Sequence, residues 1–222
     1  GSQDFTVIDI SDPANTTYET SLSLSGSLYN LWVEGDYAYV VSSDNSKELM
    51  IIDISDPTSP SEVGSYNCSG NRNAFGVFAI GTTVYVTRDS SGSTDELEVI
   101  DASTPSSPTS LGSLNLGADG NEIYVSGDYA YIAANDSSDE FMVVDISDPS
   151  SMSVDTTLNL SGSDEGETIT GFDDRVIIGT EDGYVYLIDV STPTSPSSIG
   201  STDLDNDVND IFLSYKNRAH SF

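Results

Sequence analysis

Short apolar segments recur along the whole chain and alternate with turns rich in glycine, aspartate, serine and proline. In one recurring segment, apolar residues lead to an aspartate followed by Ile-Ser-Asp-Pro or a close variant. Its five copies are FTVIDISDP (5–13), LMIIDISDP (49–57), LEVIDASTP (97–105), FMVVDISDP (141–149) and VYLIDVSTP (185–193). The shared aspartates are Asp9, Asp53, Asp101, Asp145 and Asp189, spaced 44, 48, 44 and 44 residues apart. A repeat of this length predicts a fold built from one repeated unit.

A second pattern, two short apolar strands joined by a tight turn, lies between these copies. It reads LWVEGDYAYVV (31–41), VFAIGTTVYVT (77–87), IYVSGDYAYIA (123–133) and ITGFDDRVIIG (169–179). Each unit therefore contains four strands, here called a to d in chain order. All eight prolines lie in the connection between strands c and d. Proline removes a donor from a β-ladder, so its confinement to one connection supports this division.

Strands a and c are apolar at both alternating positions, which indicates that both faces of each sheet are covered. Four-stranded sheets repeated in this way predict an all-β, five-bladed β-propeller of four-stranded antiparallel blades, with one domain over 1–222. The expected blades are 28–70, 73–117, 119–162, 165–204, and 207–222 together with 5–26. In the last blade, C-terminal strands a and b (209–214 and about 217–222) would pair with N-terminal strands c and d. A fragment of a larger ring is the alternative, because KNRAHSF is a poor copy of the second strand.

The five copies of Leu/Phe-x-Val/Ile-Val/Ile-Asp resemble the LVIVD repeat, a family of β-propeller proteins found mainly in bacteria and archaea. The resemblance extends from Phe5 through the last unit, with local departures at Ala102, Thr104 and Thr192 in the turns. It implies a propeller and an extracytoplasmic setting. It transfers no catalytic residue, because the family has no established reaction.

The charge balance narrows the classes of partner. Six Lys and Arg residues against 37 Asp and Glu give a net charge of −31, which disfavours nucleic acid and suits a halophilic protein. Cys68 and His220 are single, which excludes an internal disulfide and most histidine-dependent catalysis. No apolar run reaches the roughly 18 residues of a membrane span. Gly1-Ser2 resembles an expression scar, so we expect a monomeric, secreted or cell-surface protein that lacks its signal peptide here, with a cytoplasmic location left open.

Carboxylates dominate the candidate chemistry. We interpret the repeated aspartates as turn-stabilising groups, because copies spread around a ring cannot converge on one site. The segment DLDNDVND carries Asp203, Asp205 and Asp207 at every second position and predicts a calcium site. A solvated acidic loop is the alternative, since the segment lacks the glycine and glutamate of an EF-hand. Calcium is the only cofactor that the sequence suggests.

The innermost strands would line a central channel. Their aligned residues are Asn30, Gly76, Glu122, Thr168 and Asp210, of which Glu122 and Asp210 are carboxylates facing the opening. One interpretation is a glycoside hydrolase that uses this pair as catalytic groups. The other is a set of polar residues that line the channel and hold water.

Tyr29, Arg72 and Phe75 lie on the same predicted rim as Glu122 and Asp210. The two aromatic rings could pack between blades or stack on a sugar or peptide, and Arg72 could pair locally or hold an anionic group. We therefore expect a non-enzymatic binding or display module that recognises a glycan, peptide or surface protein at the acidic rim. The alternatives are the hydrolase and a purely structural ring of a larger surface protein.

Overall fold

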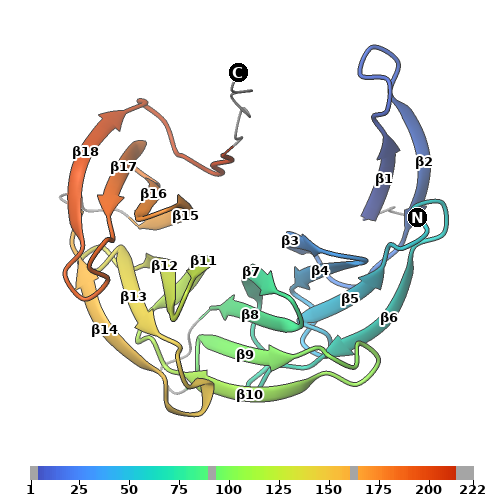
Figure 1. Cartoon of the computed structure of the whole chain (residues 1–222), viewed down its shortest axis with the longest axis horizontal. Coiled ribbons are helices and arrows are strands. Elements are labelled where there is room, and N and C mark those ends of the chain that lie inside the picture. The colour runs from blue at the N-terminus through green and yellow to red at the C-terminus, as the bar shows by residue number, and fades with distance from the viewer. Residues whose placement is uncertain (1–4, 90–93, 161–164, 214–222) are drawn as a thin grey trace, which may run out of the picture.

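The computed structural model describes residues 5–89, 94–160 and 165–213 and is built almost entirely of antiparallel strands. Four complete four-stranded sheets surround a common centre, with β3, β7, β11 and β15 innermost (Figure 1). Their strands are β3 (Leu28–Glu34), β4 (Tyr37–Ser42), β5 (Leu49–Asp53) and β6 (Ser61–Tyr66); β7 (Ala74–Ile80), β8 (Thr83–Arg88), β9 (Leu97–Asp101) and β10 (Thr109–Leu114); β11 (Asp119–Ser126), β12 (Tyr129–Asn135), β13 (Phe141–Asp145) and β14 (Ser153–Leu158); and β15 (Gly166–Phe172), β16 (Arg175–Thr180), β17 (Tyr184–Asp189) and β18 (Ser197–Asp203). Strands β1 (Phe5–Asp9) and β2 (Thr17–Leu22) form a two-stranded sheet, and η1 (Pro149–Ser151) is a single 3-10 turn. This arrangement confirms the all-β, five-bladed propeller-like fold.

The turns form where the sequence predicts them. Gly35, Gly81 and Gly127 join the first two strands of their blades with φ near +60°, at 59°, 59° and 60°. Glycine adopts this left-handed conformation without a steric penalty. Asp173 occupies the same place in the fourth blade with φ 48°, because aspartate is among the few other residues that tolerate it.

The repeated aspartates hold the turn after the third strand of each blade. A carboxylate oxygen of each accepts a hydrogen bond from the backbone N–H two residues later. The N–H donors are Ser11 at 2.8 Å, Ser55 at 2.9 Å, Ser103 at 2.8 Å, Ser147 at 2.9 Å and Ser191 at 3.0 Å. This contact is an Asx turn, and it supports the turn-stabilising interpretation of all five.

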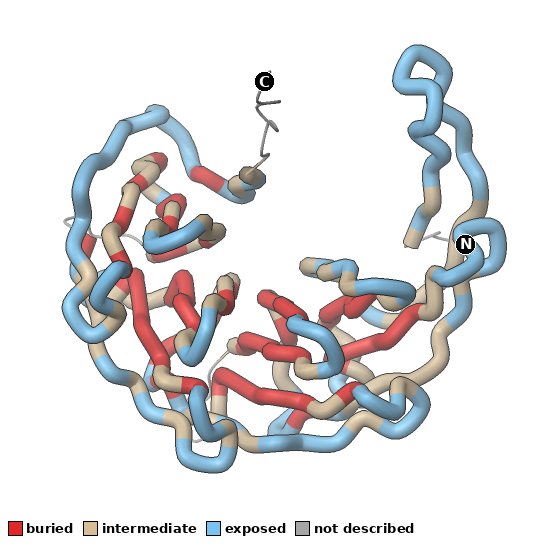
Figure 2. Tube along the Cα trace, viewed as in Figure 1, coloured by how far each residue is buried: buried red, intermediate tan, exposed pale blue. Residues whose placement is uncertain are grey.

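The core lies between neighbouring blades. Middle strands such as β5 and β13 are buried on both faces except at their last residue. Each large apolar cluster joins residues of two adjacent blades, and the outermost strands β6, β10, β14 and β18 contain only half-buried and exposed residues (Figure 2). A smaller cluster joins Phe5 and Leu22 of the two-stranded sheet to β4 and β5. Blade-to-blade packing therefore explains why the middle strands are uniformly apolar.

The ring is not closed as the sequence predicts. Within the described residues, β1 and β2 pair only with each other, and 209–213 form no strand. Figure 1 shows β1 and the chain after β18 on opposite sides of an opening. The Leu204 and Val208 N–H groups donate to the Gly183 and Thr180 carbonyls at 2.9 and 3.2 Å, which ties this stretch to the fourth blade. The predicted strand at about 217–222 lies outside the described residues.

Side-chain exposure marks the opening. Leu31 and Val33 of β3 are each 51% exposed, whereas Val77 and Ala79, their equivalents in β7, are 3% and 2% exposed. In β7 the preceding blade covers these positions. At β3 the preceding sheet supplies only β1 and β2, so its inner strands are missing from the described structure.

Among the described residues, no helix is long and apolar enough to cross a bilayer.

Candidate functional site

A β-bulge at the same place in every inner strand shapes the candidate site. The pairing register shifts between Leu28 and Asn30 in β3, and at the corresponding residues of β7, β11 and β15. The residues inside these shifts are Tyr29, Phe75, Asn121 and Glu167. A bulge leaves one residue unpaired and redirects its side chain, and bulges are common beside functional sites. Here all four side chains line one hollow at the centre of the ring.

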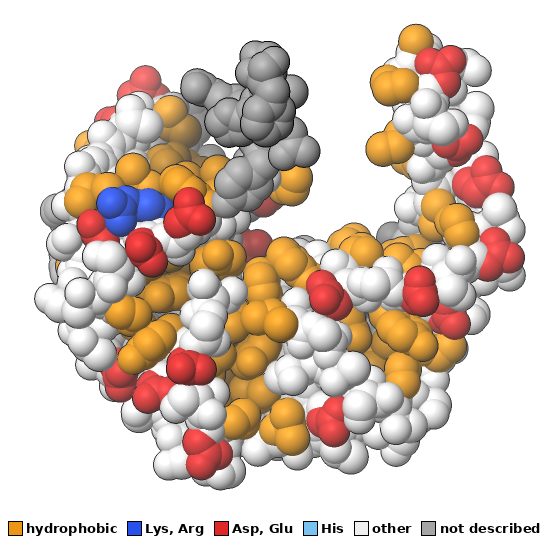
Figure 3. Space-filling model, in the orientation of Figure 1, with side chains coloured by type: hydrophobic (Ala, Val, Ile, Leu, Met, Phe, Trp, Pro, Cys, Tyr) orange, Lys and Arg blue, Asp and Glu red, His pale blue; other side chains and the backbone are white. Residues whose placement is uncertain are grey.

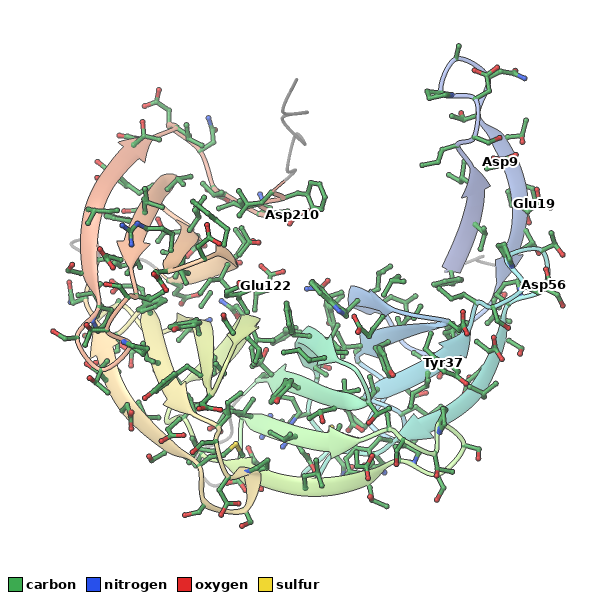
Figure 4. The ribbon with its side chains drawn as sticks, viewed as in Figure 1. Asp9, Glu19, Tyr37, Asp56, Glu122 and Asp210 are labelled. Atoms are coloured by element: carbon green, nitrogen blue, oxygen red, sulfur yellow. The ribbon has the colours of Figure 1, made fainter. Side chains whose placement is uncertain are left out.

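This hollow, which we call the polar mouth, has a volume of about 390 Å³. Its lining consists of two aromatic rings, three amides and three carboxylates: Tyr29, Phe75, Asn30, Asn121, Asn209, Glu122, Glu167 and Asp210. Figure 4 places Glu122 and Asp210 beside the central hollow, one on β11 and the other after β18. The structure thus brings together four residues predicted from the sequence: Tyr29, Phe75, Glu122 and Asp210.

Glu122 connects three inner strands. Its Oε1 accepts a hydrogen bond from Asn30 Nδ2 of β3 at 3.1 Å. Its Oε2 accepts from Thr168 Oγ1 and the Ile169 N–H of β15, at 2.6 and 2.8 Å. Gly76 of β7 stands between β3 and β11, where a Cβ would lie 2.9 Å from the Glu122 Cα. The absence of a side chain at Gly76 therefore leaves room for the Asn30–Glu122 contact.

Opposing effects act on the pKa of Glu122. Burial raises it, while the hydrogen bonds from Thr168, Ile169 and Asn30 lower it and the nearby Asp210 charge raises it; the net direction is upward. Desolvation disfavours the charged form, and donors aimed at the carboxylate favour it. Both Glu122 oxygens are used in structural contacts, which suits a channel-lining residue. Asp210 lines the same hollow as Glu122, so the hydrolase interpretation of this pair of carboxylates stays a prediction.

The inner-strand aromatic side chains meet across the blades. Tyr29 and Phe75 form an edge-to-face pair at the polar mouth, with ring centroids 4.9 Å apart and an interplanar angle of 76°. At the opposite end of the inner strands, the ring centroid of Phe78 lies 4.0 Å from that of Trp32 and 5.6 Å from that of Tyr124. The aromatic pairs therefore contribute to inter-blade packing, as one sequence interpretation expects, and Tyr29 remains 48% exposed at the polar mouth.

That opposite end opens into a second hollow of about 450 Å³, which we call the apolar mouth. Trp32, Phe78, Tyr124 and Phe212 line it together with aliphatic residues. Asn30, Glu122 and Asp210 line both mouths, so the two hollows meet at the same polar layer. This second hollow is not among the expectations from the sequence.

Arg72 lies outside both hollows. Its charge lowers the pKa of Asp89, although burial has the larger effect and raises that pKa. Asn73 Nδ2 also donates to Asp89 Oδ2 at 3.0 Å. Arg72 therefore lies close enough to Asp89 to act on its charge, and both interpretations of Arg72, local pairing and anion binding, stay predictions.

The acidic residues that come together near the rim are not the predicted triplet of Asp203, Asp205 and Asp207. Asp203 Oδ1 accepts a hydrogen bond from the Asp205 N–H at 2.8 Å, within a turn in which Asp205 has φ 63°. Among the described residues, the carboxylates whose oxygens lie within 4.8 Å of one another are those of Glu165, Glu167 and Glu181. Burial raises the pKa of Glu167, and so do the charges of Glu181, Glu165 and Asp207. These three glutamates form a second set of groups that could hold a hard cation.

Three buried glutamates were missed by the sequence analysis. Glu48, Glu96 and Glu140 are at most 1% exposed and stand directly before the third strand of their blades. Each accepts a hydrogen bond from the backbone N–H twenty residues later, in Cys68, Leu116 or Leu160, at 3.1, 2.7 and 2.9 Å. The sequence signal is a glutamate followed by Leu or Phe, in KELMIID, DELEVID and DEFMVVD. In the fourth blade Tyr184 takes this place.

Comparisons with known proteins agree with the fold. The structure superposes on the computationally designed Ika8 protein with a TM-score of 0.66 and 12% identity, over 97% of this chain and 61% of that chain. It superposes on the computationally designed Ika4 protein with a TM-score of 0.58 and 14% identity, over 76% of this chain and 94% of that one. This chain therefore spans about three fifths of the length of Ika8. At such low identity, both likenesses concern the fold alone.

Sequence comparison identifies the family. No curated protein matches the chain. The model of the LVIVD repeat matches residues 1–23, 25–68, 76–115, 117–159 and 176–203, which together make up most of the sequence. The chain therefore belongs to the LVIVD repeat family.

Proposed function

We propose that this protein is a non-enzymatic, extracytoplasmic binding module that holds a glycan at the polar mouth. The observation that carries the proposal is the bulge repeated in β3, β7, β11 and β15, which directs one side chain from every complete blade into the same hollow. A ligand that touches all four strands gives them a common purpose.

The lining suits a ligand rich in hydroxyl groups. Asn30, Asn121 and Asn209 present amide groups at the hollow, each with one Nδ2 hydrogen bond to a protein group and further donor and acceptor capacity, and Asp210 can accept hydrogen bonds. The half-exposed Tyr29 ring, braced by Phe75, offers an apolar face against which a sugar ring can pack. The net charge of −31 repels anionic ligands, so neutral glycans fit better than acidic ones. A peptide or a surface protein is the competing partner class.

Calcium is a secondary part of this proposal. Glu167 lines the polar mouth and also belongs to the cluster of Glu165, Glu167 and Glu181. A divalent cation there would relieve the mutual repulsion of the three carboxylates and add an electrophilic centre for sugar hydroxyl groups. The proposal therefore places calcium beside the ligand and not in the turn formed by Asp203 and Asp205.

The rival function is a glycoside hydrolase. It is favoured by the two carboxylates, Glu122 and Asp210, that line one hollow, and by the raised pKa of Glu122. An acid and a nucleophile or base on opposite sides of a sugar are the minimum requirement for such chemistry. The three hydrogen bonds that occupy Glu122 argue for the binding module.

A glycan array followed by calorimetry of the best ligand tests the proposal. We expect Tyr29→Ala to weaken binding about tenfold, a loss of roughly 1.4 kcal/mol. Tyr18→Ala is the matched control, because Tyr18 is a 59% exposed tyrosine on β2 outside the hollow. Equal loss in both variants, or binding of peptides in place of glycans, would overturn the glycan assignment. Turnover of a glycoside that Glu122→Gln abolishes would establish the hydrolase instead.

A further inference from the structure

The apolar mouth combines aromatic rings with carboxylates. Trp32, Phe78 and Tyr124 lie side by side on three consecutive inner strands, with Phe78 in contact with both neighbours. Phe212, which is 85% exposed, lines the same hollow. Figure 3 shows hydrophobic side chains gathered around the central hollow on the viewed face. Phe212 is open to solvent and Trp32 and Tyr124 are half-buried, whereas Phe78 is 8% exposed and belongs to the core. The aromatic surface that a ligand can reach at this mouth therefore comes from Phe212, Trp32 and Tyr124.

The charge at this mouth is one-sided. Glu122 and Asp210 stand at its inner end, and its lining within the described residues contains no Lys or Arg. On the face seen in Figure 3, Lys and Arg are confined to a place over the sheet of β15–β18. The chain as a whole carries a net charge of −31. The potential inside the hollow is therefore negative, and the low-dielectric walls strengthen it.

Organic cations suit these two features together. The face of an aromatic ring attracts a cation, most strongly when the cation is partly desolvated, and a carboxylate at the end of the hollow adds a second attraction. Lysine and arginine side chains also have an apolar stem that can lie against the aliphatic residues that line this mouth. A neutral apolar side chain would gain the packing of the stem but not the attraction of a cation to the aromatic rings and the carboxylate.

We propose that the apolar mouth binds the cationic side chain of a basic peptide segment, with the charged group against the aromatic rings and Asp210 and the stem along β3. This second site lies at the opposite end of the channel from the proposed glycan site and takes a ligand of different charge. It does not depend on the glycan proposal. The partner class is a protein or peptide that presents an exposed lysine or arginine.

The chain contains a built-in reporter for this site, because Trp32 is its single tryptophan. Titration with a blocked glycine peptide that contains one lysine should change Trp32 fluorescence and reach saturation. The same peptide with norleucine in place of lysine keeps the stem and removes the charge. We expect it to bind at least about tenfold more weakly, in line with the strength of cation–aromatic contacts. Raising the NaCl concentration should weaken only the lysine peptide.

Two substitutions at exposed positions test the geometry without disturbing the core. Asp210→Asn and Phe212→Leu should each weaken the lysine peptide by about threefold to fivefold. Phe75→Leu is the matched control, because Phe75 is an inner-strand aromatic residue at the polar mouth, and it should leave the affinity unchanged. The proposal would be overturned if the lysine and norleucine peptides bound with equal affinity. It would also be overturned if neither Asp210→Asn nor Phe212→Leu weakened binding of the lysine peptide.

The two proposed sites fail separately. If the glycan proposal is wrong, no sugar binds but the lysine peptide still changes Trp32 fluorescence. If the cation proposal is wrong, the fluorescence titration shows no charge dependence, whatever the glycan array gives. Tyr29→Ala should affect sugar binding alone, and Phe212→Leu should affect peptide binding alone.

Discussion

In three of the four complete blades, carboxylates recur in two regions whose environments act on them in opposite ways. At the turn after the third strand, Asp145 lies near the surface and accepts a hydrogen bond from a residue two positions later. At the start of the same strand, Glu140 is 1% exposed and accepts from Leu160, twenty positions later. The aspartate organises only its own turn. The glutamate ties the chain that leaves one blade for the next, so it acts on the packing of the ring.

The two environments also move the pKa in opposite directions. Hydrogen bonds from the side chain and backbone of Ser147 hold the pKa of Asp145 below its usual value. Burial raises the pKa of Glu48, although hydrogen bonds from backbone N–H groups, including that of Cys68, oppose the shift. The turn thus stabilises the anion of Asp145, whereas burial disfavours the anion of Glu48.

Removing an interior carboxylate should have the largest effect. Glu96→Ala leaves the Leu116 N–H without its acceptor and opens a cavity at a fully buried position. We expect a loss of about 2–4 kcal/mol in the free energy of unfolding, measured by urea denaturation. Glu96→Gln keeps the shape and an acceptor, and should stay within about 1 kcal/mol of the parent chain. Similar losses for both variants would show that charge, and not the hydrogen bond, is what the position requires.

The pH dependence of the free energy of unfolding should give the second largest difference between the buried glutamates and the turn aspartates. A raised pKa in the folded state stabilises the fold fully below the unfolded pKa, and this contribution is lost as pH rises through the folded pKa. For Glu48 the loss therefore begins near the usual value of 4.5 and continues upward. Glu48→Gln should remove this loss, so its stability relative to the parent chain should increase between about pH 4.5 and 7. A constant difference across that range would contradict the burial effect.

The turn aspartates should show the reverse dependence. A lowered pKa stabilises the fold above the unfolded value, and the contribution is lost as pH falls through the folded pKa. Asp145→Ala should therefore destabilise the protein at pH 7, much less than Glu96→Ala does, and the difference should shrink below the usual value of 3.8. Thermal melts at pH 7 and pH 3 measure it. A loss as large as that of Glu96→Ala would remove the distinction between local and long-range carboxylates.

Calcium should give the smallest effect. Millimolar calcium should raise the melting temperature by about 1–3 °C, because a ligand bound only to the folded state adds a few tenths to about 1 kcal/mol. Glu165→Gln should abolish the increase if the cluster of Glu165, Glu167 and Glu181 holds the ion. Asp205→Asn should leave it intact. The opposite pattern would return the site to the sequence-predicted triplet of Asp203, Asp205 and Asp207.

The sequence predicted much of the candidate site because its residues recur in register. The alignment of Asn30, Glu122 and Thr168 follows from repeat spacing alone, and the structure joins all three by hydrogen bonds. The bulges at Tyr29 and Phe75 could not be predicted in this way, because a bulge depends on how two strands pair and not on the pattern of either one. The contact between Glu122 and Asn30 also needed Gly76, whose role appears only when three blades meet.

Within the described residues, the predicted closure of the ring does not form, for a related reason. Complementary half-units at 5–26 and 207–222 establish that strands could pair, but pairing also requires that blade packing bring them together. In the described structure the backbone bonds of Leu204 and Val208 hold the chain beside the fourth blade, away from β1. Whether the two ends of the ring meet depends on the angle between each pair of neighbouring blades, summed around the ring. The spacing of the sequence repeat gives no information about these angles.

The order of the strands, the turns and the aspartates that hold them were determined by the sequence alone. Each depends on contacts within a few residues, where residue type and spacing decide the geometry. The tertiary structure decided which carboxylates became buried, which side chains share the two mouths, and whether the ring meets at its ends. These features depend on groups twenty to ninety-two residues apart, as from Glu96 to Leu116 or from Asn30 to Glu122, which only the packing of whole blades brings into contact.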